Sequence, residues 1–302
     1  MNKKILAVIA AVVLVACASI IAFESYSKDN GNDSKGTIYV TMSWEQEMVE
    51  AICGNDYTVI SFVEAGSDPH GTDATPSEIA GAADADVYFY IGSGIEWETT
   101  NLDTIKENIP ELHTVDLCGE SGITLLEGDP DEGEETDPHV WTSPSNLAAF
   151  AEVVLNTLTE RYPEDASMFE TGYEEYKEKC TMAETEADEY LSGLSGSEIV
   201  IWHPAWSYLF SDYSIRQLEL KESVSGSTTP ATVIATLVGA TSAVNPVNVY
   251  VGSIDDLPLT KGELAESGIY VNVIVVNQLA TDWIDYLSYA IETFGTTIDA
   301  SK

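Results

Sequence analysis

The chain has 302 residues, of which 44% are hydrophobic, so it can bury a core large enough for two lobes. It carries 12 basic and 51 acidic residues, which gives a formal net charge of −39. Because such a charge repels the phosphates of nucleic acids, the composition excludes nucleic-acid binding and is compatible with a cation ligand or a saline exterior.

The N-terminus has the pattern of an export signal. Lys3 and Lys4 precede an apolar run over residues 5–23, and a run of this length could also remain as a membrane anchor. Within the run, Leu14-Val15-Ala16-Cys17 resembles the lipobox of secreted lipoproteins. We therefore expect residues 1–36 to be a signal or anchor plus a flexible spacer. The rest of the chain should be extracytoplasmic and tethered to the cell membrane by the Cys17 lipid or by an N-terminal anchor helix.

Strand and helix patterns alternate along the rest of the chain. The expected strands are residues 37–43, 57–65, 84–91 and 112–117 in the first half, and 198–202, 215–220, 247–251 and 270–276 in the second half. A short helix over residues 101–108 is expected to lead into the fourth strand. Such alternation predicts an α/β fold with mainly parallel sheets in both halves.

One apolar stripe separates the two halves. At helical spacing it includes Phe169, Tyr173, Tyr176, Cys180, Ala183, Ala187 and Tyr190. It predicts a helix over residues 163–191, which would be roughly 40 Å long at 1.5 Å per residue and longer than one lobe needs. We expect an N-terminal lobe over residues 37–162, a connecting long helix over 163–195 and a C-terminal lobe over 196–302.

Three of the four histidines share one setting. His70 and His203 follow expected strands, His139 lies in the loop after the fourth strand, and a proline adjoins each of them. Ligands of open α/β sheets bind outside the carboxyl ends of the strands, and neutral imidazoles suit zinc and, less selectively, other transition metals. The pattern therefore predicts a metal site. His113 stands at the start of a strand and is interpreted as structural.

Three cysteines follow Cys17 and show no C-x-x-C spacing. They are Cys53, Cys118 and Cys180. An odd number leaves at least one of them unpaired, and buried free thiols are favoured over a Cys53–Cys118 disulfide.

Several segments resemble, in the same order along the chain, the metal-binding solute receptors of ABC transporters that take up zinc or manganese. They are residues 65–70, 75–79, 83–86, 92–97, 137–144 and 203–209, and the similarity covers about residues 37–294. The resemblance implies two α/β lobes joined by one long rigid helix, with the metal in the interlobe cleft. It also implies a small movement on binding, with His70, His139 and His203 as ligands.

The resemblance implies a fourth ligand, an aspartate just after the last strand, and this chain has Asn277 at that place. An amide oxygen is a weaker, neutral ligand, so Asn277 is a doubtful fourth position. A water molecule is one alternative, and Asp255, Asp256 and Asp282 are others.

A further acidic residue is expected to support the site without touching the metal. Ligating histidines usually donate their second ring N–H to a carboxylate or a carbonyl. Asp73 follows His70 closely enough to orient it in this way.

Together with the N-terminal pattern, the resemblance implies a monomeric, membrane-anchored receptor that is not an enzyme and that delivers Zn²⁺ to a permease with its ATPase. Mn²⁺ is the alternative cargo. Zinc is favoured because His203 stands where manganese-type members carry glutamate. The chain has no G-x-x-x-x-G-K-[ST] motif, so ATP hydrolysis would belong to a partner.

Two other functions are compatible with the sequence. A secreted zinc hydrolase is one, because three histidines and a water resemble a catalytic zinc, although the chain has no H-E-x-x-H helix. The other is a surface adhesin of the same fold in which the metal is structural.

Overall fold

The computed structural model describes residues 34–67, 69–70, 74–128, 135–220, 230–241, 246–256, 259 and 261–300. The expected lipid site at Cys17, and the leader apart from residues 34–36, lie outside these ranges. Among the described residues, no helix combines the length and the apolar character that crossing a membrane requires.

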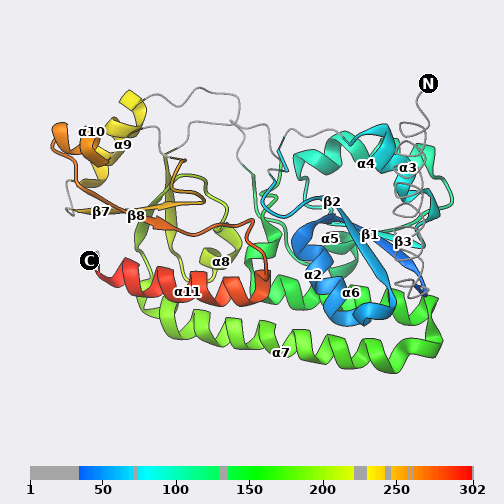
Figure 1. Ribbon diagram of the computed structural model, residues 1–302. Coiled ribbons are helices and arrows are strands. Elements are labelled where there is room, and N and C mark those ends of the chain that lie inside the picture. Colours follow the sequence, from blue (N-terminus) through cyan, green and yellow to red (C-terminus); the bar gives the residue numbers. More distant parts are fainter. Residues whose placement is uncertain are drawn as a thin grey trace, which may run out of the picture.

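The fold contains two parallel sheets that lie side by side (Figure 1). The first sheet has the strand order β2-β1-β3-β4, with bounds β1 Thr37–Met42, β2 Thr58–Val63, β3 Val87–Tyr90 and β4 His113–Asp116. The second sheet has the order β6-β5-β7-β8, with bounds β5 Glu198–Ile201, β6 Arg216–Glu219, β7 Val247–Val251 and β8 Val271–Val275. All pairings are parallel, so the predicted α/β fold with two lobes is confirmed.

Helices connect the strands in both lobes. Those of the first lobe are α2 Ser43–Cys53, α3 Pro76–Gly81, α4 Glu96–Asn108, α5 Leu117–Ser121 and α6 Pro144–Arg161. Those that follow in the second lobe are α8 Ser207–Ser211, α9 Pro230–Thr241, α10 Lys261–Glu266 and α11 Trp283–Ala300. Because parallel strands need a crossover, a helical segment follows nearly every strand.

Helix α4 begins at Glu96, earlier than the expected 101–108. Trp97, in its first turn, is buried, and its N–H donates to the carbonyl of Pro69 at 3.1 Å. Glu98 is buried as well and accepts hydrogen bonds from the N–H groups of Ile91 and Gly92 at 2.6 and 2.9 Å. The contact with Pro69 comes from a distant part of the chain, so the local pattern did not reveal the first turn.

The long connecting helix is α7, which covers the 26 residues Ala166–Leu191 after a 3₁₀ turn at Pro163–Asp165. It packs against α2 and α6 of the first lobe and against α11 of the second, and it runs below both sheets in Figure 1. The predicted stripe is buried except at Tyr190, which is half-buried, and Leu191 continues it.

Two glycines let α7 approach its neighbours closely. A Cβ at Gly172 would overlap the backbone of Ala51 and Ile52 in α2, and a Cβ at Gly295 of α11 would lie 2.9 Å from the Tyr190 ring of α7. Since real Cβ atoms are not found this near to other atoms, glycine is required at both crossings. The helix is therefore in close contact with both lobes.

The three described cysteines, Cys53, Cys118 and Cys180, are buried free thiols, as the favoured interpretation held. Burial raises the pKa of Cys53 and of Cys180 to about 12. All three belong to the large hydrophobic core that extends through both lobes along α7. They therefore act as small apolar core residues.

Candidate metal centre

The three predicted histidines lie in three connecting segments that are far apart in the sequence, and each such segment is called a corner below. His70 lies in the loop after β2, and its neighbour Pro69 is bound to the first turn of α4 through the carbonyl that accepts from Trp97. His203 follows β5, and its neighbour Pro204 is held by Gln217 of β6, whose amide donates to the Pro204 carbonyl at 3.2 Å. Each corner is therefore positioned by a regular element next to it.

The corner at His139 is held by both lobes. Ser93, from the first lobe, donates to the carbonyl of Pro138 at 2.8 Å, and Tyr208 of α8 donates to the carbonyl of Asp137 at 2.8 Å. The hydroxyl of Thr142, in the turn that follows, donates to the His139 carbonyl at 2.9 Å. The backbone is thus fixed on both sides of this histidine, whose exposed fraction is 5%.

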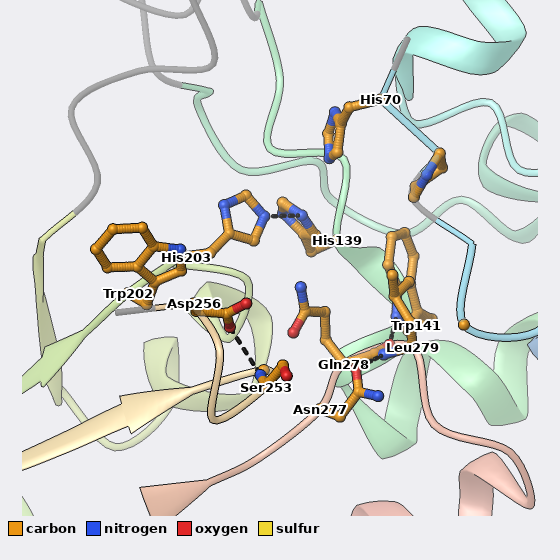
Figure 2. A pocket seen from close by; sticks show the side chains of 13 residues that line it. His70, His139, Trp141, Trp202, His203, Ser253, Asp256, Asn277, Gln278 and Leu279 are labelled. Atoms are coloured by element: carbon orange, nitrogen blue, oxygen red, sulfur yellow. Dashed lines mark hydrogen bonds between the residues drawn. The ribbon is translucent and has the colours of Figure 1, made fainter. Parts of the chain in front are cut away.

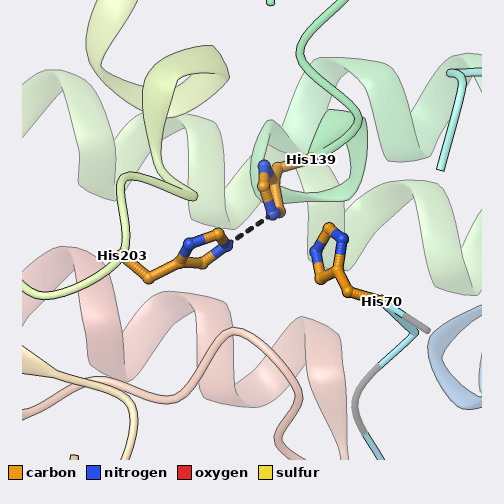
Figure 3. Close-up of side chains that lie close together, drawn as sticks. All are labelled: His70, His139 and His203. Atoms are coloured by element: carbon orange, nitrogen blue, oxygen red, sulfur yellow. Dashed lines mark hydrogen bonds between the residues drawn. The ribbon is translucent and has the colours of Figure 1, made fainter. Parts of the chain in front are cut away.

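The structure brings the three imidazoles together at the junction of the lobes (Figure 3). Their nearest ligand atoms all lie within 4.8 Å of one another. The ring centroids of His139 and His203 are 4.8 Å apart, and that of His70 lies 6.0 and 5.8 Å from them. No other cluster of histidine, cysteine or carboxylate groups with metal-site spacing occurs among the residues that the structure describes.

The carboxylate of Asp137 defines how His139 presents its ring. Asp137 Oδ1 accepts from His139 Nδ1 at 2.9 Å. Burial raises the pKa of this carboxyl, but the hydrogen bonds and the charge interaction with His139 outweigh it, so the pKa lies below its ordinary value. The charged carboxylate keeps the proton on Nδ1, and the lone pair of Nε2 points toward the other histidines.

The nitrogens of His139 and His203 nearly have the spacing of a metal centre. Their Nε2 atoms are 2.9 Å apart and share a hydrogen bond, in which His203 donates because His139 Nε2 accepts in the neutral ring. Two nitrogens bound to tetrahedral zinc at about 2.0–2.1 Å lie about 3.3 Å apart. Small ring rotations would therefore let the three imidazoles reach one ion, once the proton leaves His203 Nε2.

The three histidines line a pocket of about 260 Å³, and side chains of the second lobe lie below them in Figure 2. Besides His203, that lobe contributes the polar side chains of Ser253, Asp256, Asn277 and Gln278 to the pocket wall. Asn277, the doubtful fourth position, lies at the pocket, but its Oδ1 accepts from the N–H of Leu279 at 2.9 Å. Gln278 was not among the predicted site residues.

Of the other candidate carboxylates that the structure describes, Asp256 lines the pocket and Asp255 and Asp282 do not. Asp256 lines the pocket, and its Oδ2 accepts from the N–H of Ser253 at 2.7 Å. Asp255 is exposed, and Asp282 borders another groove, between α2, α7 and α11. Asp73 lies outside the described residues.

A carboxylate that was not among the predicted site residues, Asp137, contacts the ring of His139. The signal was present in the sequence, because an aspartate two residues before a histidine commonly accepts from the N–H of that histidine. Asp137 does so at 2.9 Å. His113, interpreted as structural, lies exposed at the first position of β4.

Hydrogen bonds between tryptophans and backbone join the lobes beside the pocket. Trp141 Nε1 donates to the carbonyl of Gln278 at 3.0 Å, and Trp283 Nε1 donates to the carbonyl of Trp141 at 2.9 Å. Trp141 is fully buried and stacks on Trp44 with ring centroids 6.0 Å apart. The segment that carries His139 therefore also holds the loop after β8.

Comparisons with known proteins agree with this architecture. A family model described as zinc-uptake complex component A, periplasmic (ZnuA), matches residues 38–296. The zinc-binding lipoprotein AdcA of Streptococcus pneumoniae is 28% identical over 231 residues, which is 72% of this chain and 44% of that protein. The iron-binding protein YfeA of Yersinia pestis is 28% identical over 225 residues, 73% of this chain and 71% of that protein.

The manganese-binding lipoprotein MntA of Halalkalibacterium halodurans is 27% identical over 165 residues, 53% of this chain and 52% of that protein. This chain thus spans about half the length of AdcA and MntA. A crystal structure of ZnuA superposes with a TM-score of 0.72 at 25% identity and covers 86% of this chain and 98% of its own. The Zn(II)-bound ZnuA-like domain of pneumococcal AdcA shares the fold, with a TM-score of 0.73 at 22% identity, over 88% of this chain and 99% of its own. The chain therefore belongs to the ZnuA family, the periplasmic component A of zinc-uptake complexes, a family of metal-binding solute receptors.

Proposed function

We propose that the chain captures a divalent metal ion, first of all Zn²⁺, outside the cytoplasm and delivers it to the permease of an ABC transporter. The observation that carries the proposal is the convergence of His70, His139 and His203, whose ligand atoms lie within 4.8 Å of one another. The names of the relatives, which are zinc-, manganese- and iron-binding proteins, support a metal ion as the cargo.

Zinc is favoured over manganese by the donor atoms. Three imidazole nitrogens suit the borderline-soft Zn²⁺, whereas Mn²⁺ prefers carboxylates, carbonyls and water. The carboxylate nearest to the cluster in the described residues, Asp137, is bonded to the far nitrogen of His139 and so supports a ligand instead of acting as one. Mn²⁺ remains the alternative cargo.

Competitive titration tests the proposal. The purified protein is stripped of metal and titrated with Zn²⁺ and with Mn²⁺ against a chromogenic chelator, and elemental analysis counts the ions bound. We expect one zinc per chain, held more tightly than manganese. His139→Ala should abolish most of this binding, whereas His113→Ala, the matched control at the start of β4, should keep it. Equal affinities of the two variants would refute the site.

We propose further that the protein is a receptor without catalytic activity. A receptor binds one ion stoichiometrically and does not turn over esters or peptides. The proposal fails if zinc-loaded protein hydrolyses such substrates and chelation abolishes the hydrolysis, because that behaviour belongs to a catalytic zinc.

The proposal also covers how the protein is attached to the membrane and how many chains it contains. The family is periplasmic, and we propose that the Cys17 lipid or an N-terminal anchor helix holds a monomer at the cell membrane, where a permease with its ATPase receives the ion. Cys17→Ala should release the protein from the membrane fraction if the lipid is the tether. Light scattering of residues 37–302 should give the mass of one chain.

A further inference from the structure

We propose that Gln278, and not Asn277, supplies the fourth ligand of the ion, through its side-chain amide oxygen, and that Asp256 positions this amide. The inference rests on the proposed function, because it adds one residue to the same metal centre. It concerns which side chain of the second lobe completes the coordination begun by the three histidines.

The side chain and the backbone N–H of Asn277 are both hydrogen-bonded to residues close by in the sequence. Its Oδ1 accepts from the N–H of Leu279 at 2.9 Å, and its own N–H donates to the hydroxyl of Tyr286 at 2.7 Å. Figure 2 shows its amide directed away from the three histidines. To reach the ion, Asn277 would have to give up the turn that shapes the loop after β8.

Gln278 has the opposite arrangement. Its backbone carbonyl is fixed by Trp141 Nε1 at 3.0 Å, while its side chain extends into the pocket toward His139 and His203 (Figure 2). Within the described part of the chain, this side-chain amide makes no hydrogen bond. A polar group on a fixed backbone that is aimed into a site and is not bonded to any of the described residues is preorganised for a ligand.

The orientation of the Gln278 side-chain amide shows that Asp256 lies on its other side, away from the histidines. Figure 2 shows Gln278 Nε2 on the side of the histidines. Gln278 Oε1 faces Gly252, where an added Cβ would lie 3.3 Å from this oxygen and 3.4 Å from Oδ2 of Asp256. A half-turn of the last side-chain bond, whose torsion is soft, exchanges the two atoms. The oxygen then faces the ion, and the NH₂ group faces the Asp256 carboxylate.

Asp256 is suited to hold that orientation. Its Oδ2 already accepts from the N–H of Ser253 at 2.7 Å, which keeps the carboxylate in the pocket wall. A carboxylate that accepts from the NH₂ group of Gln278 also makes the amide oxygen more negative and so a better ligand. Glycine at position 252 leaves the space that this arrangement occupies.

Two leucine substitutions of similar shape test the assignment. Gln278→Leu removes the oxygen but keeps the carbonyl that Trp141 binds, whereas Asn277→Leu removes the oxygen at the neighbouring position. In competitive titration with a chelator, Gln278→Leu should weaken zinc binding by about tenfold or more, the range for disturbed groups around a metal. Asn277→Leu disturbs the turn after β8 but removes no ligand in this assignment, so it should weaken zinc binding less than Gln278→Leu does. The opposite ranking, or equal affinities of both variants and the wild type, overturns the proposal.

Two further variants separate a ligand from a merely structural residue. Gln278→Glu offers a harder, charged oxygen and should raise the affinity for Mn²⁺ relative to Zn²⁺, an effect that a structural role would not produce. Asp256→Asn should weaken zinc binding less than Gln278→Leu does, and Asp255→Asn, at the exposed neighbour, should leave it unchanged. An unaltered ratio of the two metals in Gln278→Glu contradicts the assignment.

The wild type and His139→Ala in the same titrations keep the two proposals apart. If the wild type binds no metal, the proposed function itself is wrong. If the wild type binds zinc, His139→Ala does not, and Gln278→Leu binds like the wild type, only the assignment of Gln278 is wrong. Melting curves of all variants without metal check that each is folded.

Discussion

Asp137 accepts two hydrogen bonds from His139, one from the backbone N–H and one from ring Nδ1, each of 2.9 Å. The same oxygen therefore fixes both the turn and the imidazole. Because His139 lies between the other two histidines and the buried Trp141, this contact determines where the Nε2 lone pair points.

Asp137→Asn should lower zinc affinity by about tenfold to a hundredfold, the usual cost of losing the carboxylate behind a ligating histidine. The amide still fits the turn, but it does not stabilise the Nδ1–H tautomer through a charge. Competitive titration measures the loss, and Asp255→Asn, at an exposed site, is the matched control. A zinc affinity within a factor of two of the wild type would show that the carboxylate is not needed.

The stabilisation by zinc should disappear in mild acid. Zn²⁺ competes with protons for the three imidazoles, so the increase in melting temperature with zinc should shrink below about pH 6. Asp137 does not explain this loss: its folded-state pKa is lowered, so its contribution is present above the ordinary value of about 3.9 and is lost only as the pH falls through the lower folded value. Melting curves with and without zinc between pH 5 and 8 test the expectation, with His139→Ala as the control that should show little zinc effect throughout.

Glu98 should give the protein a second pH dependence, independent of metal. Burial raises its pKa to about 7, although hydrogen bonds from Thr41, Gly92 and Ile91 act in the opposite direction. Because the folded-state pKa exceeds the unfolded one, the folded protein binds the extra proton, and its free energy of unfolding falls as the pH rises from about 4.5 to about 7. The fall attributable to this group is up to roughly 3 kcal/mol.

Glu98→Gln removes this titration, so the wild type should lose stability relative to the variant over that pH range. Urea denaturation at pH 5 and pH 7.5 without metal measures the difference. Glu96→Gln, two residues away and exposed, should run parallel to the wild type. A constant gap between wild type and Glu98→Gln would show that Glu98 titrates at its ordinary value.

The carboxylate of Glu47 joins the lobes away from the metal. It lies on α2, and it accepts from the N–H groups of Asp282 and Trp283, at 2.9 and 2.6 Å, at the start of α11. Since these are unpaired donors of a helix N-terminus, Glu47→Ala should cost about 1–2 kcal/mol of unfolding free energy. Denaturant titration is the measurement, and Glu50→Ala, one turn further on α2 and exposed, is the control. Equal midpoints of the two variants would contradict the prediction.

Much of this architecture could be predicted because it depends on short-range patterns. Alternating strands and helices indicated two parallel sheets, and the stripe from Phe169 to Ala187 indicated α7. The three histidine corners were recognisable because a proline adjoins each histidine after a strand or in a loop. Such features need no knowledge of how distant segments meet.

The remainder depends on long-range contacts. The first turn of α4 exists because Trp97 binds the carbonyl of Pro69, and Gln278 faces the pocket because Trp141 binds its carbonyl from 137 residues away. The strand pattern over residues 270–276 carries no information on which of the two amides that follow it, Asn277 or Gln278, turns inward. The sequence therefore indicated Asn277 for the fourth position, whereas the side chain that extends into the pocket is the next one, Gln278.

Helix α7 has a consequence for how an ion could leave. Gly172 of α7 lies against Ala51 and Ile52 of the first lobe, and Tyr190 of α7 lies against Gly295 of the second lobe. The helix therefore packs closely on both lobes. The two lobes could not swing apart in a hinge motion without bending this continuous helix of 26 residues. Under the proposed function, a membrane partner would therefore release the ion by displacing the side of the site that belongs to the second lobe, namely His203 and the loop at Gln278. Release of the ion would then require the movement of a few side chains and not of a whole lobe.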